Sequence, residues 1–480
     1  MAAHTGTRAN SRLIALIVAS AMFMAGLDAS VVVVAMPDMA RTFSVRPVDL
    51  NIGITIYILA QAVLLPSSSW VADRFGARRV FVLALAGFTV ASILCGLSRT
   101  LPQFIAARVV QGAAASFMTP IARIVLLRST QKEDLIGVLT ISTVPMLVAP
   151  TLGPPVGGFI TTYLSWPWIF LLNVPVGIAG VLLVLRFIPP IRGEPRRPFD
   201  AVGFALLAAA SGGALFGLEL VSASNGPWAL GGGLVLAGLA CGVVAVRHLR
   251  SHPHPVLSLN AARIPTFAAT SINGGVLVRL PVRALPFILP LLFEVVLGYS
   301  AVYSGLLLLA MNGGDLLLKT AATRSMRRFG FRSVLIASTA VMLVSVMGCA
   351  AFSRATGYWV IFAVLAGSGM ARSLLFTGMG TLAFADVPHE ELGSATVLWN
   401  LVLQATNALG VTLAAIVMNL TSWALGEPMG HVTLSNCRVA LIVMALIGAL
   451  SLVSFARLPQ HAGAAVSGHR PRQLAEPSES

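Results

Sequence analysis

The pentapeptide Arg74-Phe75-Gly76-Ala77-Arg78 recurs 254 residues later as Arg328-Phe329-Gly330-Phe331-Arg332, and a valine stands two residues after each copy. Each copy lies in a short polar loop between two long apolar runs. Internal similarity of this kind is the sequence trace of a structural repeat. The chain is therefore predicted to consist of two related halves.

Apolar runs fill most of the chain. Its 480 residues are 57% hydrophobic and 10% charged, with a mean hydropathy of +0.87, which lies outside the range of soluble proteins. Roughly fourteen runs reach the length of about 20 residues that crosses a bilayer as a helix. We expect spans at 12–36, 48–71, 79–98, 101–127, 136–163, 168–188, 200–221, 228–246, 264–296, 301–322, 332–352, 356–383, 392–420 and 434–456.

The basic residues are sorted between alternate loops. Of the 32 Lys and Arg residues, 22 lie in the even-numbered loops and the two termini, five in the odd-numbered loops and five inside spans. Positive charge is retained on the cytoplasmic side of membranes, so the even loops and both termini are predicted to be cytoplasmic. Topology and the anionic inner leaflet account for the net charge of +15, and nucleic-acid binding is not expected.

The spacing of the repeat predicts the domain organisation. Six spans with their loops need about 190 residues, so an offset of 254 leaves room for two further spans. We expect an all-α polytopic membrane protein with a six-helix bundle at 12–190, two inserted helices at 199–248, a second six-helix bundle at 263–457 and a disordered cytoplasmic tail at 458–480.

The long apolar run at 264–296 differs from the others. It exceeds one straight crossing and contains Pro281, Pro286 and Pro290. Proline removes a backbone hydrogen bond and bends a helix, so a kinked or broken helix is predicted here.

Five further motifs occur in order along the first half. They are Leu27-Asp28-Ala29-Ser30 with Ala35-Met36-Pro37, then Ala72-Asp73-Arg74-Phe75-Gly76-Ala77-Arg78-Arg79, Arg108-Val109-Val110-Gln111-Gly112, Gly153-Pro154-Pro155-Val156-Gly157-Gly158 and Trp168-Ile169-Phe170-Leu171-Leu172-Asn173-Val174-Pro175-Val176-Gly177. Together they resemble the major facilitator superfamily, specifically its fourteen-span drug:proton antiporters of the EmrB/QacA type. Within this branch the chain most resembles the MdtD-type multidrug transporters, at Leu285-Pro286-Phe287, Lys319, Arg328-Phe329-Gly330 and Arg372.

The resemblance implies the major facilitator fold, two six-helix bundles that rock around a central cavity, with two inserted helices. It implies a conformational latch in the cytoplasmic loop, formed by Asp73, Arg74, Gly76 and Arg78. It also implies an antiporter motif in the fifth span, formed by Gly153, Pro154, Gly157 and Gly158. Plain topogenic charge and close helix packing are the simpler alternatives for these two motifs.

Asp28 and Arg108 are the candidates for proton coupling. Counted from the outer ends of their spans, both lie about 11–13 Å below the outer surface. A charge at this depth needs a partner or a function. The matching depth permits a pair in which Asp28 takes and releases a proton while Arg108 competes for it; a static ion pair that orients two helices is the alternative.

Other polar residues inside the spans are candidates for a substrate cavity. Asn400, Gln404 and Asn407 form a polar stripe on one helix face, which either lines a cavity or bonds to neighbouring helices. Asp315 and Lys319 share a face and form either a local salt bridge or a second proton site. Weaker candidates of the same kind are Tyr57, Gln61 and Gln111.

Three arginines in the second half are unusual for membrane spans. Arg279 and Arg283 share a face on either side of Pro281, and Arg372 lies in a later span. Guanidinium groups suit carboxylates and phosphates, so these residues either hold an anionic substrate or pair with Glu294 and with carbonyls freed at the prolines.

No catalytic or cofactor motif accompanies these features. His248, His252 and His254 form an HxxxHxH pattern, but the prolines beside it and the lack of acids nearby in the sequence favour an ordinary loop over a metal site. Neither a Walker A sequence nor a nucleophile motif is present. We therefore expect no enzyme activity, no cofactor and no bound metal.

The sequence as a whole predicts a multi-pass transporter of the bacterial inner membrane. The predicted function is proton-coupled export of small amphipathic compounds by alternating access, with a small-molecule substrate, protons and membrane lipid as its partners. Two alternatives stay open: export of a metabolite anion such as a carboxylate or its metal complex, and a non-transporting sensor or scaffold on the same fold. The need for a periplasmic adaptor is also open.

Overall fold

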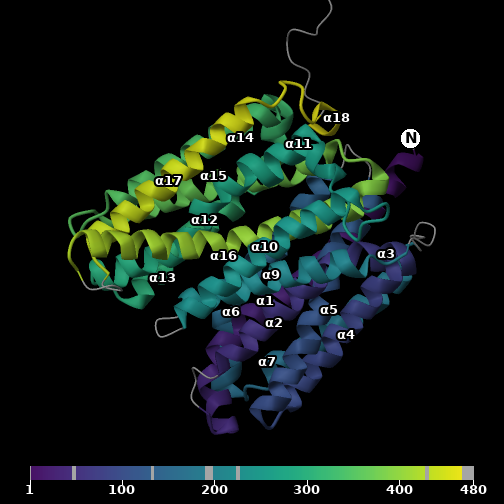
Figure 1. Ribbon diagram of the computed structural model, residues 1–480, viewed down its shortest axis with the longest axis horizontal. Coiled ribbons are helices and arrows are strands. Elements are labelled where there is room, and N and C mark those ends of the chain that lie inside the picture. Colours follow the sequence, from purple (N-terminus) through teal and green to yellow (C-terminus); the bar gives the residue numbers. More distant parts are fainter. Residues whose placement is uncertain are drawn as a thin grey trace, which may run out of the picture.

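The computed structural model describes residues 2–45, 50–130, 135–189, 198–222, 227–319, 321–427 and 432–467. Every regular element in these ranges is helical (Figure 1). Twelve helices are long and apolar enough to cross a membrane. Helices also occupy the two other ranges predicted to be spans, 136–163 and 301–322. The all-helical architecture is confirmed, whereas the count of fourteen spans stays a prediction.

The first half of the chain folds into one set of helices, drawn purple to blue in Figure 1. In it, α1 packs against α6 and α8, α5 packs against α2 and α4, and α4 packs against α8. The bounds are α1 Ala2–Phe43, α2 Asn51–Leu64, η2 Leu65–Ser67, α3 Ser68–Phe75, α4 Ala77–Leu97, α5 Leu101–Arg128, α6 Leu135–Tyr163, α7 Trp168–Leu171 and α8 Asn173–Phe187.

The second half forms a corresponding set, in which α15 packs against α13 and α14, and α17 packs against α12, α14 and α16. The bounds are η4 Asn260–Arg263, α11 Pro265–Phe267, η5 Ala268–Asn273, α12 Gly274–Pro290, η6 Leu291–Val296, α13 Ala301–Lys319, α14 Ala322–Ala350, α15 Tyr358–Ala385, η7 His389–Glu391, α16 Leu392–Ala424, α17 Leu434–Ala456 and α18 Ala464–Ser467.

Between the two sets lie the inserted helices, α9 (Ala201–Ser222) and α10 (Trp228–Ser251). They pack closely on each other because glycines face across the pair: a Cβ on Gly217 would lie 2.6 Å from the carbonyl oxygen of Gly231. Small residues permit this approach in membranes. Helix α9 of this pair also contacts α2 and α16, so the pair touches both bundles.

The repeated pentapeptide has the same backbone conformation in both halves. Gly76 has φ 86° and Gly330 has φ 76°, each at the corner between two helical segments. Positive φ is readily adopted only by glycine. The repeat is therefore structural, because it marks the same tight corner in each half.

The predicted break at 264–296 has a different form from the one expected. Pro281 and Pro286 lie inside α12, which is α-helical throughout. The departures from α-helix are the π-helical segments on either side of it, η5 and η6. Proline cannot donate to the preceding turn, but here the helix accommodates it, and the register changes in the flanking segments instead.

Both ends of the described chain lie at one end of the bundles, since the start of α1 and α18 occur together (Figure 1). We call this the basic end, because the basic segments at 72–79 and 321–332, which join α3 to α4 and form the start of α14, are also there. The predicted disorder of the tail does not begin at 458. Residues 458–467 include α18, and Val466 is only 2% exposed; the rest of the predicted tail lies outside the described residues.

Candidate functional site

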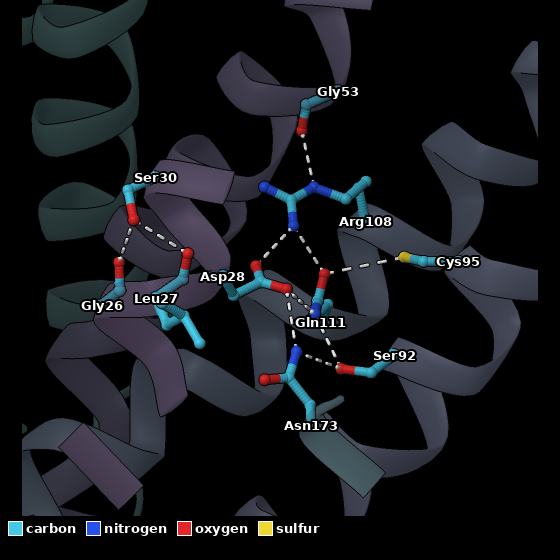
Figure 2. Close-up of polar contacts among 10 residues, drawn as sticks. All are labelled: Gly26, Leu27, Asp28, Ser30, Gly53, Ser92, Cys95, Arg108, Gln111 and Asn173. Carbon is cyan, nitrogen blue, oxygen red and sulfur yellow. Dashed lines mark hydrogen bonds and ion pairs between the residues drawn. The ribbon is translucent and has the colours of Figure 1, made fainter. Parts of the chain in front are cut away.

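Asp28 of α1 lies at the centre of a buried polar network in the first bundle (Figure 2). Nη1 of Arg108 donates to its Oδ2 at 2.8 Å. The side-chain amides of Gln111 and Asn173 donate to its Oδ1 at 2.9 and 3.2 Å. Asp28 is 2% exposed and Arg108 1%. Three donors thus replace the water that a carboxylate would lose on burial.

Arg108 of α5 is itself fixed by further contacts. Its Nε donates to the carbonyl of Gly53 at 3.1 Å, and its Nη1 also donates to Oε1 of Gln111 at 2.6 Å. The guanidinium carbon lies 4.3 Å from the centre of the Tyr57 ring, a cation–π distance. The position of the guanidinium therefore depends on α2 as well as on α1.

A second layer completes the network. Oγ of Ser92 accepts from the amides of Gln111 at 3.0 Å and of Asn173 at 3.4 Å, and Sγ of Cys95 donates to Oε1 of Gln111 at 3.6 Å. These residues bring α4 and α8 to the same point, so five helices of the first bundle meet around one carboxylate (Figure 2).

The pairing of Asp28 with Arg108 follows the matching depths read from the sequence, but the other members of the network were assigned differently or missed. Gln111 and Tyr57 were cavity candidates and here contact Arg108. Asn173 was quoted only as part of a motif. The available signal for Asn173 was that it is a polar residue inside an otherwise apolar run. That signal does not reveal that its partner is Asp28.

The glycine motif of α6 lies directly against α1. A Cβ on Gly153 would lie 2.0 Å from Oγ of Ser30, and one on Gly157 would lie 3.1 Å from Val31, whereas one on Gly158 would meet nothing within 4 Å. Ser30 is two residues from Asp28. Gly153 and Gly157 therefore allow α6 to approach the part of α1 that carries the carboxylate, and Gly158 has no such role.

The acid of the second bundle, Asp315, is held by two bases. Its Oδ2 accepts from Nε of Arg372 at 2.9 Å, and its Oδ1 lies 3.8 Å from Nζ of Lys319. Nη2 of Arg372 donates to Asn312 at 3.0 Å. The sequence offered Glu294 as a partner for Arg372, and this is wrong: Glu294 is exposed, and Asp315 is the partner because α13 and α15 pack together.

Arg279 and Arg283 differ from Arg372, because neither forms an ion pair with a carboxylate in the described parts of the chain. Arg279 is fully buried, donates from Nη1 to the carbonyl of Ser271 at 3.1 Å, and lies with its guanidinium carbon 4.3 Å from the Trp399 ring. Arg283 lies 6.0 Å from the Phe376 ring. Both keep buried N–H groups without partners among the described residues.

Arg123 of α5, which was not among the residues predicted from the sequence, reaches across to the second bundle. Its Nη2 donates to the carbonyl of Gly380 at 3.2 Å, and its guanidinium carbon lies 4.6 Å from the Phe384 ring and 5.0 Å from the Trp399 ring. Trp399 is therefore contacted by one guanidinium from each bundle.

The polar stripe on α16 grades from buried to exposed. The amide of Asn400 donates to the carbonyl of Thr396 at 2.8 Å, so it is satisfied within its own helix. Gln404 is half-buried, with Oε1 unpaired among the described residues, and Asn407 is exposed. Gln61 of α2 is half-buried. Of these candidates, Gln404 is the one with an unused buried polar atom.

The predicted latch residues at the basic end contact neighbouring helices. Asp73 pairs with Arg128 of α5 at 3.1 Å, and a Cβ on Gly393 in the first turn of α16 would lie within 4 Å of both side chains. Arg74 lies 5.9 Å from the Trp70 ring, and Arg78 donates to the carbonyl of Leu185. The start of α16 thus rests on an ion pair of the first bundle.

Comparison with known proteins agrees with this architecture. The sequence profile of the Major Facilitator Superfamily matches residues 18–314 and 272–477. "Putative multidrug resistance protein MdtD" of Serratia proteamaculans is 35% identical over 452 residues, covering 92% of each chain, and that of Klebsiella pneumoniae (strain 342) is 35% identical over 457 residues, covering 93% of this chain and 94% of the relative.

The chain belongs to the major facilitator superfamily.

Solved structures show the same superfamily fold at low sequence identity. The human organic anion transporter MFSD10 aligns with a TM-score of 0.67 and 13% identity, covering 93% of this chain and 99% of that one. The proton:xylose symporter XylE aligns with a TM-score of 0.64 and 12% identity, covering 95% and 97%. As a superfamily member the protein is a transporter and not an enzyme, and it is a multi-pass protein of the bacterial inner membrane.

The inserted helices of this superfamily member are tied together at Asp200, which the sequence analysis also missed. Oδ1 of Asp200 accepts from the backbone N–H of Gly203 at 2.8 Å and lies 2.8 Å from Nε2 of His248, while Oδ2 accepts from the N–H of Val256 at 3.2 Å. Asp200 therefore joins the start of α9, the end of α10 and the loop that follows α10.

The histidine pattern, which has no acid nearby in the sequence, therefore has one nearby in the fold. Asp200, His248 and His252 each offer a potential ligand atom, and these atoms lie within 4.8 Å of one another. The acid was missed because it is 48 residues from His248 in the sequence. Its oxygens are already bonded to two backbone N–H groups, as expected of a helix N-cap, so the arrangement supports a structural tie.

A cavity of about 700 Å³ opens at the basic end beside this tie. Its lining includes Trp70, Asp73 and Arg74 from α3, His252 after α10, and Glu391 before α16. The cavity lies away from the Asp28 network. It shows that the inserted pair, the latch loop and the start of α16 meet at one place.

We predict that Gly153→Ala destabilises the protein by about 1–3 kcal/mol, because the new methyl group overlaps Ser30. The matched control is Gly158→Ala, which places the same methyl group in open space and should change stability by no more than about 0.5 kcal/mol. Thermal unfolding of the purified variants measures both. Equal unfolding temperatures for the two variants would contradict the packing role of Gly153.

The ionised carboxylate of Asp200 should stabilise the folded protein, and this stabilisation should depend on pH. Burial acts to raise the pKa of Asp200, but its hydrogen bonds with Gly203, His248 and Val256 outweigh burial and lower that pKa. A lowered pKa means that the stabilisation is present above the ordinary value of about 3.9 and is lost as the pH falls through the folded value.

Asp200→Ala should therefore cost about 1–2 kcal/mol at neutral pH and flatten the acid limb of the stability curve, whereas Asp200→Asn keeps the helix cap and should cost less. Unfolding temperatures measured from about pH 3 to about pH 7, a range that includes the ordinary pKa of an aspartate, test this effect. The partly exposed Asp38, changed to Asn, is the control; an unaltered acid limb in Asp200→Ala would refute the tie.

Proposed function

We propose that the protein is a proton-coupled exporter that moves small amphipathic compounds out of the cytoplasm in exchange for protons, by alternating access. The observation that carries this proposal is the Asp28–Arg108 pair, a single carboxylate and a single guanidinium that are both almost fully buried and joined at 2.8 Å. Burying a charged side chain inside a membrane costs free energy, so a charge found there indicates a function.

Protonation of Asp28 is the step that would change the hydrogen bonds of the network. A carboxylate accepts from all three of its donors, whereas a protonated carboxyl group loses its negative charge and must place a hydrogen towards one of them. The attraction to Arg108 would then weaken. The guanidinium has alternative contacts in place, the carbonyl of Gly53, the amide of Gln111 and the Tyr57 ring, so it can remain bound while the carboxyl group is released.

Contacts across the two bundles support the alternating-access part of the proposal. Arg123 bonds to Gly380, and the first turn of α16 rests on Asp73 and Arg128. All of these lie towards the basic end, which the distribution of basic residues assigns to the cytoplasm. These contacts support the proposal that the described conformation is the one closed on the cytoplasmic side. Loading from the cytoplasm would require these contacts to separate.

The substrate class rests on the relatives and on the lining of the spans. The MdtD relatives carry the description of multidrug resistance proteins, which supports export of drug-like compounds. Export of an anion is the second candidate, and one observation favours it: Arg279 and Arg283 are buried without carboxylate partners in the described residues.

Reconstituted vesicles test the proposal. Purified protein is placed in liposomes with an acidic lumen and a luminal pH dye, and lipophilic cations, lipophilic anions and carboxylates are added one at a time. We expect at least one class to evoke proton efflux from the lumen. Asp28→Asn should abolish that efflux because the amide cannot take up and release the coupled proton.

The matched control is Asp38→Asn, which removes the same charge from the same helix at a partly exposed position. It should retain the response. Full substrate-evoked proton movement in Asp28→Asn would refute the coupling role. Size-exclusion chromatography establishes that both variants are folded before they are compared.

A further inference from the structure

The basic residues inside the helices divide into a paired and an unpaired set. Arg108 pairs with Asp28, and Arg372 pairs with Asp315. Arg123, Arg279 and Arg283 form no ion pair with a carboxylate in the described ranges, and each keeps a buried Nε without a hydrogen-bond partner there. This unpaired set lies where α5 of the first bundle meets α12, α15 and α16 of the second.

Trp399 of α16 is the centre of the unpaired set. The guanidinium carbon of Arg279 lies 4.3 Å from the centre of its ring and that of Arg123 lies 5.0 Å from it. Cation–π contacts compensate part of the cost of burying a guanidinium. They leave the donors in the guanidinium plane unused, and Arg279, which is 0% exposed, has two such nitrogens, Nε and Nη2.

Two like charges around one indole ring repel each other, and a medium of low dielectric constant strengthens the repulsion. The buried acids Asp28 and Asp315 do not relieve this repulsion, because they pair with Arg108 and Arg372 instead. An anion bound between the two groups would relieve it, since a carboxylate, sulfonate or phosphate matches the guanidinium fork.

We propose that the exported compound is an organic anion, and that its acidic group binds at Trp399 between Arg123 of the first bundle and Arg279 of the second. This inference rests on the proposed function, because it assigns a substrate class to that transport cycle. Because the two arginines belong to different bundles, the anion bridges them and stabilises the state that is closed at the basic end. Loading of substrate and closure of the cytoplasmic side thereby become one event.

A matched pair of probes tests the charge requirement. Naphthalene-2-sulfonate and 2-naphthylmethylammonium have similar aromatic bodies and opposite charges. Binding of each to the protein in lipid nanodiscs is measured by calorimetry, and proton efflux is measured in the vesicles described above. We expect the sulfonate to bind and to evoke efflux, and the ammonium compound to do neither.

Variants locate the site. Arg279→Gln and Arg123→Gln should each weaken sulfonate binding about tenfold or more, the loss expected for one charged hydrogen-bonding partner. Arg186→Gln removes the same charge from an exposed position at the basic end of α8 and should bind normally. Arg123 is only half-buried, so its variant keeps the test decisive if Arg279→Gln does not fold.

The outcomes separate this inference from the proposed function. Efflux evoked by the ammonium compound alone would preserve proton-coupled export and overturn the anion site. Sulfonate binding that depends on Arg123 and Arg279 without any proton movement would support the site and refute proton coupling. Failure of the folded protein to bind the sulfonate, or binding that neither variant weakens, would overturn the inference.

Membrane potential gives an independent readout. Transporters whose basic end faces the bath would move the sulfonate anion into the lumen and a proton out of it. Both movements make the lumen more negative, so each turnover transfers net positive charge from the lumen to the bath. An inside-positive potassium diffusion potential should therefore accelerate sulfonate-evoked efflux. A one-for-one exchange of a monovalent cation for a proton would be unaffected, so a rate that is independent of potential would contradict anion–proton exchange at this stoichiometry.

Discussion

The ion pair between Asp28 and Arg108 is the constraint on which the first bundle depends. Removing one partner of a buried pair typically costs about 3–5 kcal/mol, because the other charge is left uncompensated. Here the cost is avoided only while α1 and α5 keep their present register, and the amides of Gln111 on α5 and Asn173 on α8 both donate to the other carboxylate oxygen, Oδ1. A proton is the one small species that can remove the charge of the carboxylate without displacing it. In the proposed cycle, protonation of Asp28 is therefore the event that loosens the centre of the bundle.

The second bundle has the same architecture and a different electrostatic balance. In the first network one acid faces one base. In the second, Asp315 alone faces Arg372 and Lys319, and Arg279 and Arg283 have no carboxylate partner among the described residues. In the proposed cycle the two related halves therefore have different roles: the first accepts a proton and the second accepts an anion. This division suits an antiporter, because the two species need not compete for the same group.

The sequence predicted what depends on periodicity and depth, and failed where side chains reach across the fold. Charge sorting and the repeated pentapeptide indicated the two-bundle architecture, since both follow from the chain's alternate crossings. Equal depth in two spans anticipated Asp28 and Arg108. It could not identify Arg123, a fifth basic residue inside the spans, because its partners Phe384 and Trp399 lie in the other bundle. Asp200 was missed for the same reason: its contact with His248 depends on how α9 packs against α10.

Helix α5 offers a physical connection between the two centres. It carries Arg108 of the proposed proton-coupling network and Arg123 of the proposed anion site 15 residues apart, a distance of about 22 Å along the axis. Pro120 lies between them and lacks the N–H that would complete the helix there, so the two segments can change their angle at low cost. In the proposed cycle, protonation of Asp28 would free α1 from the end of α5 that carries Arg108, while an anion at Trp399 would hold the end that carries Arg123 against the second bundle. Coupling requires an element with two arrangements that both ligands bias, and in the proposed cycle α5 is that element.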